Sequence, residues 1–150
     1  MTTYLSSSAK QTRAVASALA KKLKRSAVVT LSGELGSGKT QFVKGLARGL
    51  GIKQTITSPT FILLRSYRLG GGKKRQRATF FSHLDLYRIK KTSDLDNLGL
   101  TEILNRKNHI IAIEWPEKIK KLLPKNHIRV FIDHYGNASN QRRIKIVGVS

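Results

Sequence analysis

The stretch Gly33–Thr40 constrains this chain more than any other feature of its sequence. It reads Gly-Glu-Leu-Gly-Ser-Gly-Lys-Thr, which matches the pattern G-x-x-x-x-G-K-[S/T] of a phosphate-binding loop, or P-loop. A short β-branched run, Ala27–Leu31, precedes this loop, and apolar residues at helical spacing follow it over Lys39–Gly49. The sequence therefore predicts a buried parallel strand, a glycine-rich turn and a helix, in this order.

The residue types in this loop suit the binding of a nucleotide together with Mg²⁺. Glycines allow the backbone to curl so that successive N–H groups point at phosphate oxygens, and the following helix adds its positive N-terminal end. We expect Lys39 to reach the β- and γ-phosphates and the Thr40 hydroxyl to bind Mg²⁺. A glycine turn that holds a lysine by accident is the alternative, and the preceding strand and following helix disfavour it. The candidate nucleotide-binding residues of the loop are Gly33, Glu34, Leu35, Gly36, Ser37, Gly38, Lys39 and Thr40.

The rest of the chain alternates predicted helices and strands. Helices are expected over Ala9–Leu23, over residues 92–106 as one or two short helices, and over Pro116–Leu123. Strands are expected over Phe61–Leu64, Ala78–Leu86, His109–Ile113, His127–Asp133 and Arg142–Val149. This order predicts one α/β domain over residues 1–150, similar to a P-loop NTPase, with three layers and a mixed, partly antiparallel sheet.

A P-loop needs carboxylates near its magnesium ion, and the whole chain has only 8 Asp and Glu residues. Asp85 and Glu114 each end an apolar stretch, and ligands gather at the carboxyl ends of parallel strands. The alternatives are a helix cap or an ion-pair partner of Arg88 for Asp85, and a structural salt bridge for Glu114. The candidate catalytic residues are Lys39, Asp85 and Glu114, and the candidate metal-binding residues are Thr40, Asp85 and Glu114.

Two further segments lie close to these residues in the sequence. Trp115 follows Glu114 directly, and its position allows either a core side chain or a platform for a ligand. Thr57–Phe61 is a polar turn that leads into a predicted strand, and an ordinary proline turn is the alternative explanation for it.

The charge of the chain is unusual, because 29 Lys and Arg against 8 Asp and Glu give a net charge of +21. Such a charge favours polyanionic partners, and RNA contact is expected through the basic loop Gly70–Arg77 or the cluster Lys118, Lys120 and Lys121. A solvated charged surface is the alternative for both.

The absence of cysteine excludes disulfides, thiolate nucleophiles and Cys-ligated metal sites. No apolar run approaches the roughly 20 residues of a membrane helix, and the N-terminus lacks the order of a signal peptide, so a cytoplasmic protein is expected.

Several motifs in combination resemble the bacterial tRNA threonylcarbamoyladenosine biosynthesis ATPase family TsaE, also called YjeE. They are GELGSGKT, TSPTF, HLDLYR, LGL and IEWPEKI, in this order, and the resemblance runs from about Ala9 to Asp133. It implies a small P-loop ATPase that uses ATP and Mg²⁺ and works with the partner proteins TsaB and TsaD. These proteins form the threonylcarbamoyl modification on the tRNA adenosine beside the anticodon. The ATPase does not transfer the group itself; its cycle supports the partner complex.

The resemblance also implies roles for individual residues. Glu34–Lys39 would bind the phosphates, Thr40 and Glu114 would bind Mg²⁺, and Asp85 would be a catalytic acid or a water-mediated partner of the metal. Thr57–Phe61 would be a switch-like segment near the γ-phosphate, and Trp115 would lie close to the nucleotide. An arginine of the final hairpin would also approach the nucleotide, and Arg142 and Arg143 both compete for that place. The long, basic Gly70–Arg77 loop and the high net charge depart from the family pattern and suggest an additional RNA-facing role.

Two other functions compete with a partner-dependent ATPase. A small P-loop metabolite kinase would require an acceptor pocket, and the sequence offers no clear one. A basic RNA-binding protein without catalysis would leave Lys39 and the strand-end carboxylates unexplained. We therefore favour the ATPase. Phosphate release without an acceptor would distinguish it from a kinase.

Overall fold

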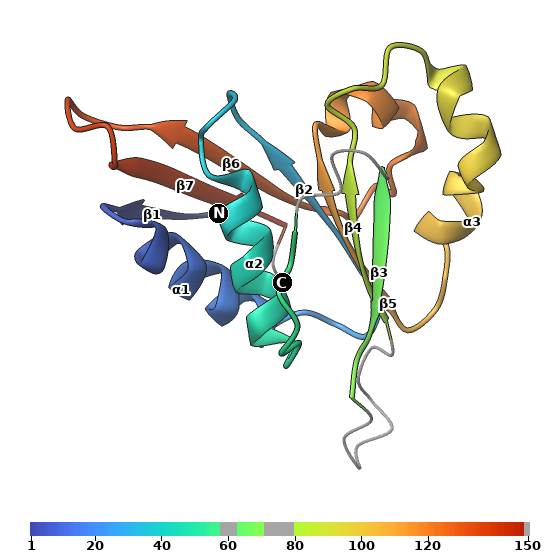
Figure 1. Ribbon diagram of the computed structural model, residues 1–150, viewed down its shortest axis with the longest axis horizontal. Coiled ribbons are helices and arrows are strands. Elements are labelled where there is room, and N and C mark those ends of the chain that lie inside the picture. The colour runs from blue at the N-terminus through green and yellow to red at the C-terminus, as the bar shows by residue number, and fades with distance from the viewer. Residues whose placement is uncertain (58–62, 71–79, 149–150) are drawn as a thin grey trace.

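A mixed sheet of seven strands forms the centre of the computed structural model, which describes residues 1–57, 63–70 and 80–148 (Figure 1). The strands are β1 (Thr2–Ser6), β2 (Ala27–Ser32), β3 (Leu64–Arg68), β4 (Phe80–Asp85), β5 (His109–Glu114), β6 (Ile128–His134) and β7 (Arg142–Val147). Their order across the sheet is β1-β7-β6-β2-β5-β4-β3. β2 pairs in parallel with β5 and β6, and β4 pairs in parallel with β5, whereas the other three pairs are antiparallel. The prediction of a mixed, partly antiparallel sheet is therefore confirmed.

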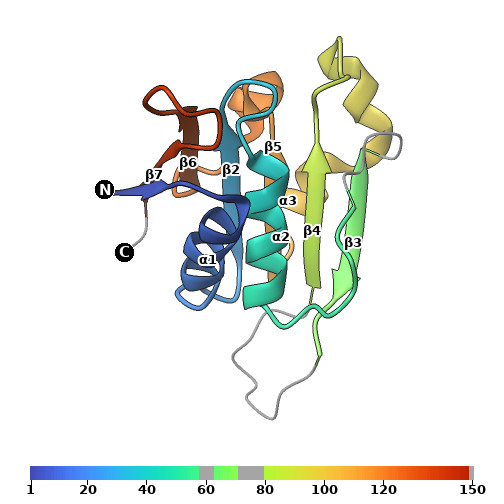
Figure 2. The same ribbon diagram turned by 60° about the vertical axis from the view of Figure 1, so that its left-hand side comes forward.

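Helices cover both faces of the sheet and complete the three predicted layers (Figures 1 and 2). On one face, α1 (Ala9–Ala20) and α2 (Lys39–Gly49) lie side by side. On the other face lie the 3₁₀ helix η1 (Thr92–Leu98), α3 (Leu100–Leu104) and the 3₁₀ helix η2 (Pro116–Leu122). In the part of the chain that the structure describes, no helix combines the length and the apolar character needed to cross a membrane.

The hydrophobic core divides into two clusters, one on each face of the sheet. Successive residues of a central strand alternate between them: Val29 packs with α1 and α2, and its neighbour Val28 packs with η1, α3 and η2. Ala112 and Ile111 of β5 divide in the same way. Because both faces are covered, the central strands are continuous apolar runs, as the sequence predicted.

The first helix begins as predicted and ends earlier. Ser8 caps its N-terminus, where the Ser8 Oγ accepts a hydrogen bond of 3.1 Å from the Gln11 backbone N–H. The helix ends at Ala20 rather than at the predicted Leu23. After Ala20 the backbone N–H groups of Lys22 and Leu23 bond three residues back instead of four, which tightens the last turn and redirects the chain into β2.

Two strand predictions are corrected by the structure. The sequence analysis assigned no strand to residues 2–6, whereas β1 forms there by antiparallel pairing with β7; four of its five side chains are exposed, so the segment carries no buried pattern. The strand predicted at Phe61–Leu64 instead runs from Leu64 to Arg68, where it pairs antiparallel with β4; residues 61 and 62 lie outside the described ranges. β7 ends at Val147 rather than at Val149, which is also outside them.

Candidate nucleotide-binding site

The Gly33–Thr40 loop joins the carboxyl end of β2 to the first turn of α2, as predicted. Gly36 and Gly38 have φ angles of 76° and 105°, which L side chains rarely adopt, and Gly38 is the N-cap of α2. A Cβ atom on Gly33 would lie 2.3 Å from the Ile132 carbonyl oxygen, so the loop packs directly on the β6 backbone. These constraints hold the loop in one curled conformation at the positive end of α2.

Lys39 is buried and lies across the loop. Its Nζ donates hydrogen bonds of 2.7 Å to the carbonyl oxygens of Gly33 and Glu34, and it lies 4.2 Å from the centre of the Trp115 ring. Burial lowers the pKa of the Lys39 ammonium, and the negative charges of Glu114 and Asp85 oppose that shift. An anion placed at the loop would replace the carbonyl partners and favour the charged form of Lys39.

Thr40, Glu114 and His83 form a connected group beneath the loop. The Thr40 hydroxyl donates to Glu114 Oε1 at 3.2 Å, and the His83 Nε2–H donates to the same oxygen at 2.8 Å. His83 and Glu114 are buried, so this contact is shielded from water. The carboxylate is thereby fixed beside the first turn of α2.

Asp85 lies next to Glu114, because the two residues are directly paired at the ends of β4 and β5. Asp85 is buried, and its Oδ1 accepts a hydrogen bond of 3.0 Å from the Tyr87 backbone N–H. The sheet register therefore brings both predicted carboxylates to the carboxyl ends of neighbouring parallel strands, on the same edge as the loop.

Trp115 closes one side of the site. It adopts a left-handed backbone conformation, with φ of 60°, directly after β5, and its ring packs against the Tyr87 ring with centroids 5.1 Å apart. The indole is half-buried: one part packs on the hydrophobic cluster below, and Lys39 Nζ lies over its face. Trp115 therefore does both things that its position in the sequence allowed: one part of the indole packs on the core, and another part lines the cavity.

Arg142 and Arg143 point in different directions. The Arg142 Nε donates to the Ser37 carbonyl oxygen at 2.8 Å and its Nη2 donates to the Gly36 carbonyl oxygen at 3.2 Å, so its guanidinium holds the tip of the loop. The Arg143 guanidinium instead lies 5.9 Å from the Tyr135 ring centre. Of the two, Arg142 is the arginine that contacts the loop.

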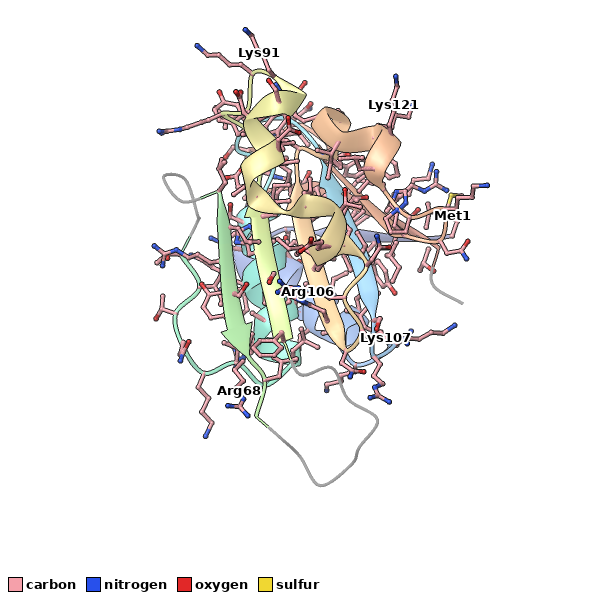
Figure 3. The ribbon with its side chains drawn as sticks, turned by 90° about the vertical axis from the view of Figure 1, so that its right-hand side faces the viewer. Met1, Arg68, Lys91, Arg106, Lys107 and Lys121 are labelled. Carbon is pink, nitrogen blue, oxygen red and sulfur yellow. The ribbon has the colours of Figure 1, made fainter. Side chains whose placement is uncertain are left out.

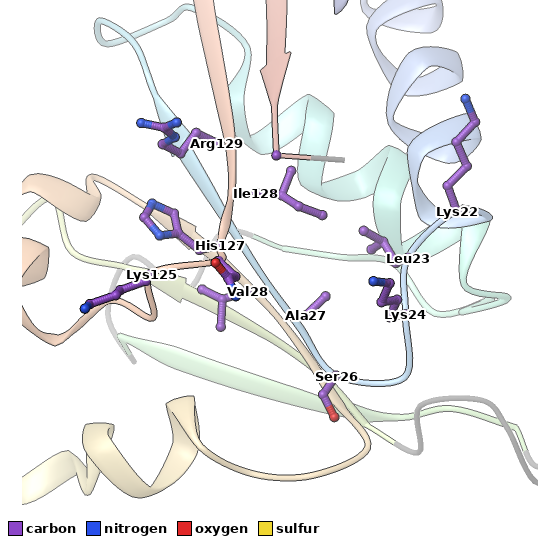
Figure 4. A pocket seen from close by; sticks show the side chains of 12 residues that line it. Lys22, Leu23, Lys24, Ser26, Ala27, Val28, Lys125, His127, Ile128 and Arg129 are labelled. Carbon is purple, nitrogen blue, oxygen red and sulfur yellow. The ribbon is translucent and has the colours of Figure 1, made fainter. Parts of the chain in front are cut away.

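These side chains surround a cavity of about 400 Å³. Its lining combines the loop with the strand ends, and includes Gly36, Gly38, Lys39, Thr40, Asp85, Tyr87, Glu114 and Trp115. A second cavity, of about 600 Å³, lies at the opposite edge of the sheet and shares no residue with the loop (Figure 4). The smaller cavity is the candidate site, because it alone of the two combines a loop of backbone N–H groups, a lysine and carboxylates.

Comparison with known proteins decides which family carries this arrangement. Residues 6–144 match the family described as threonylcarbamoyl adenosine biosynthesis protein TsaE. The chain belongs to the TsaE family. The prediction from the sequence motifs is thus confirmed, and the chain has the family's role in tRNA threonylcarbamoyladenosine biosynthesis.

Individual relatives agree with this assignment. The TsaE protein of Bacillus subtilis is 33% identical over 138 residues, which cover 92% of this chain and 81% of that protein. The TsaE protein of Treponema pallidum is 37% identical over 126 residues, covering 84% and 87%. The crystal structure of Bacillus subtilis YdiB superposes with a TM-score of 0.78 at 28% identity, covering 99% of this chain and 86% of that one.

The donor set of this TsaE chain fits a nucleotide with Mg²⁺. The Ser37 Oγ is buried and has no hydrogen-bond partner within the described residues, and open space lies where Cβ atoms of Gly36 and Gly38 would stand. Thr40 and Glu114 provide the hard oxygen ligands that Mg²⁺ prefers. The described ranges contain no group of three or more His, Cys, Asp or Glu that would cage a metal by itself. Mg²⁺ is usually held by one or two protein carboxylates together with phosphate oxygens and waters.

Other predicted segments do not join the site or lie outside the described residues. Of the switch-like segment Thr57–Phe61, only Thr57 is described, and of Gly70–Arg77 only Gly70. Lys118, Lys120 and Lys121 are exposed on η2 and do not line the cavity.

Sequence reasoning missed His83 and Tyr87. His83 precedes Asp85 by two residues in an alternating strand, so it lies on the same face as Asp85, and that spacing was a usable signal. Its partner Glu114 is 31 residues away, and only the pairing of β4 with β5 brings the two together. Tyr87 meets Trp115 through a turn after β4 that carries no such pattern.

Proposed function

We propose that this TsaE chain binds ATP with Mg²⁺ in the cavity below the Gly33–Thr40 loop and slowly hydrolyses the γ-phosphate. In this proposal its activity supports partner proteins of the TsaB and TsaD kinds as they form the threonylcarbamoyl group of tRNA. One observation carries the proposal: Lys39, the Thr40 hydroxyl and the buried carboxylate of Glu114 converge on one cavity at the amino end of α2. That combination suits a phosphate chain and a divalent cation and has no evident use in a purely structural role.

The loop and Lys39 would bind the phosphates. The backbone N–H groups of Gly36–Thr40 at the start of α2 offer several donors in one concave surface. Lys39 would exchange its two carbonyl partners for phosphate oxygens, and its charge would stabilise the transferring phosphoryl group. Arg142 would position the loop, because its guanidinium contacts the Gly36 and Ser37 carbonyls rather than the cavity itself.

Thr40 and Glu114 would hold Mg²⁺, which neutralises phosphate charge when bound. His83 would keep the Glu114 carboxylate oriented through its buried hydrogen bond. Asp85, on the adjacent strand end, would orient the attacking water or contact the metal through water. Trp115 and Tyr87 would shield one side of the site from solvent.

The test is phosphate release from ATP by the purified chain, with and without Mg²⁺ and with and without partner proteins of the TsaB and TsaD kinds. We expect slow, Mg²⁺-dependent release without any acceptor, and tRNA threonylcarbamoylation that requires this chain when the partners are present. Transfer of the phosphate to a metabolite would instead identify a kinase. Absence of ATP binding would contradict the proposal outright.

A further inference from the structure

The side of the sheet at which the parallel strands begin and the side at which they end differ in charge. Three segments precede the parallel strands β2, β5 and β6 at their amino ends: residues 21–26, 105–108 and 124–127. We call this side of the molecule the amino edge. The three segments contain seven Lys and Arg residues and no Asp or Glu: Lys21, Lys22, Lys24, Arg25, Arg106, Lys107 and Lys125.

All acidic residues lie elsewhere. Four of them line or adjoin the nucleotide site, namely Glu34, Asp85, Glu114 and Glu117. Asp133 lies near the end of β6, and Asp94, Asp96 and Glu102 belong to η1 and α3. In Figure 3, Arg68 and Lys107 mark the lower, amino edge, whereas Lys91 and Lys121 lie at the upper end. A uniformly basic composition would not by itself produce this separation.

The cavity of about 600 Å³ opens at the amino edge (Figure 4). Its apolar residues are Leu23, Ala27, Val28 and Ile128, and each of them is buried or half-buried. Lys22 and Lys24 stand on one side of the cavity, and Lys125 and Arg129 stand on the other. The cavity therefore has an apolar floor and a cationic rim, built by the turn after α1 and the start of β6.

Three rim side chains are accessible and uncompensated. Lys22, Lys125 and Arg129 are exposed, and none of them forms an ion pair within the described ranges. Like charges gathered in this way repel one another, so the arrangement stabilises nothing within the fold. It becomes favourable when phosphates occupy the rim and bound counterions are released.

The rim continues onto an uncovered part of the sheet. Arg129 is an outward-facing residue of β6, and the next outward residue, Phe131, is 37% exposed and lies directly across from the exposed Lys145 of β7. A cationic rim beside an exposed aromatic ring suits a nucleic-acid strand, whose phosphates and bases alternate. A membrane surface fits less well, since the apolar residues of this cavity are buried or half-buried, whereas Lys22, Lys125 and Arg129 are exposed.

We propose that the amino-edge cavity binds the phosphate backbone of an RNA, and that this RNA is the tRNA on which the protein's partners act. The identity of the RNA rests on the proposed function, whereas the location of the surface rests on the charge separation and the cavity. RNA and ATP would then bind at opposite edges of the sheet. Neither would exclude the other.

The test compares two triple variants of equal charge. The first, Lys22→Ser, Lys125→Ser and Arg129→Ser, removes three cations from the rim. The matched control, Lys118→Ser, Lys120→Ser and Lys121→Ser, removes three exposed cations from η2. Binding of an unmodified tRNA transcript is measured over a range of KCl concentrations, and ATP hydrolysis is measured in parallel.

For the rim variant, we expect the slope of log K against log salt to fall by about two to three, using roughly 0.7 to 0.9 per phosphate contact. Its affinity near 0.1 M salt should fall at least about tenfold by the same relation, with ATP hydrolysis unchanged. The η2 control should keep most of its affinity and its slope.

Three results would overturn the inference: equal weakening in both variants, which would indicate net charge alone; binding to phosphatidylcholine–phosphatidylserine vesicles but not to tRNA; or no tRNA binding by the unmodified protein. Failure of the proposed ATPase is a separate result. A chain without hydrolysis that still loses tRNA affinity in the rim variant would contradict the ATPase proposal and support this surface.

Discussion

The two edges of the central sheet use charge in opposite ways. At the carboxyl edge, the side on which β2, β4 and β5 end, Lys39, Asp85 and Glu114 are buried, and charges of both signs lie within one cavity. At the amino edge, Lys22, Lys125 and Arg129 are exposed and of one sign. Buried, oriented groups act strongly at short range, whereas exposed charges are screened by salt over about 10 Å. The two ends of the strands therefore differ in how their charges can act: one holds buried charges of both signs, and the other holds exposed charges of one sign.

The largest effect is expected from replacing Lys39, and it tests whether a change at the carboxyl ends of the strands leaves RNA binding at the amino edge unaffected. Lys39→Ala should reduce ATP hydrolysis by about a hundredfold or more, because roughly 3 kcal/mol of stabilisation of the transferring phosphoryl group is lost. The variant should remain folded, and tRNA binding should keep its salt dependence, because Lys39 lies at the opposite end of the strands from the amino edge. Arg48→Ala, an exposed cation at the far end of the same helix, is the control and should leave hydrolysis unchanged. Wild-type hydrolysis by Lys39→Ala would show that the site is wrongly assigned.

The next effect concerns the metal. Glu114→Gln should raise the Mg²⁺ concentration needed for hydrolysis by about ten- to a hundredfold, because the amide keeps the shape of the side chain but removes its charge. Glu102→Gln, an exposed carboxylate on α3 away from the cavity, should behave as the wild type. Asp85→Asn should lower the rate with a weaker dependence on Mg²⁺. If Glu114→Gln and Asp85→Asn retain equal, magnesium-independent activity in a phosphate-release titration, both carboxylates are structural.

A smaller effect is expected at His83, the buried residue whose hydrogen bond orients Glu114. His83→Leu removes the hydrogen bond to Glu114 Oε1 and should cost about tenfold in hydrolysis, with a matching rise in the Mg²⁺ requirement. His83→Gln, which can still donate, should recover part of both. A loss of stability alone would not raise the Mg²⁺ requirement. If His83→Leu and His83→Gln titrate with Mg²⁺ like the wild type, His83 only fills space.

The smallest effect is expected at His109, a second buried histidine, which lies at the amino edge rather than beside the nucleotide site. Burial and then the nearby positive charge of Arg106 lower the pKa of His109 below its ordinary value of about 6.5. Between the two pKa values, the unfolded chain binds a proton at His109 that the folded chain does not. The contribution of His109 to the free energy of unfolding is therefore fully present above pH 6.5, and it is lost as the pH falls from there toward the folded pKa.

His109→Gln should remove this contribution and flatten the fall of unfolding free energy on acidification, measured by urea unfolding at several pH values. His134→Gln, at the exposed end of β6, is the matched control. Equal pH dependence in the His109 variant and the wild type would show that the fold tolerates a charged His109.

Several elements were predictable because their signals are local. The glycine loop, the strand before it and the helix after it fall within residues 27–49, and the continuous apolar run of that strand indicated its burial on both faces. β1 escaped prediction because an exposed edge strand is held by its partner β7 rather than by a buried face of its own. The choice between Arg142 and Arg143 was equally out of reach, since neighbouring residues of a strand point to opposite faces and only the sheet's placement shows which face holds the loop.

The sequence by itself determined that a glycine-rich loop with the P-loop pattern follows a buried strand, because its eight residues are contiguous and their backbone geometry is set by glycine. Only the tertiary structure decided what stands beside that loop. Thr40 and Glu114 are 74 residues apart, and Asp85, His83 and Glu114 meet because β4 and β5 pair in parallel with one particular register. The parallel pairing of β2 with β5 and β6 gathers the amino ends of these three strands, and so concentrates cations that are spread evenly along the chain. Such contacts depend on strand order and register, which arise from packing of the whole core and not from any short stretch of residues.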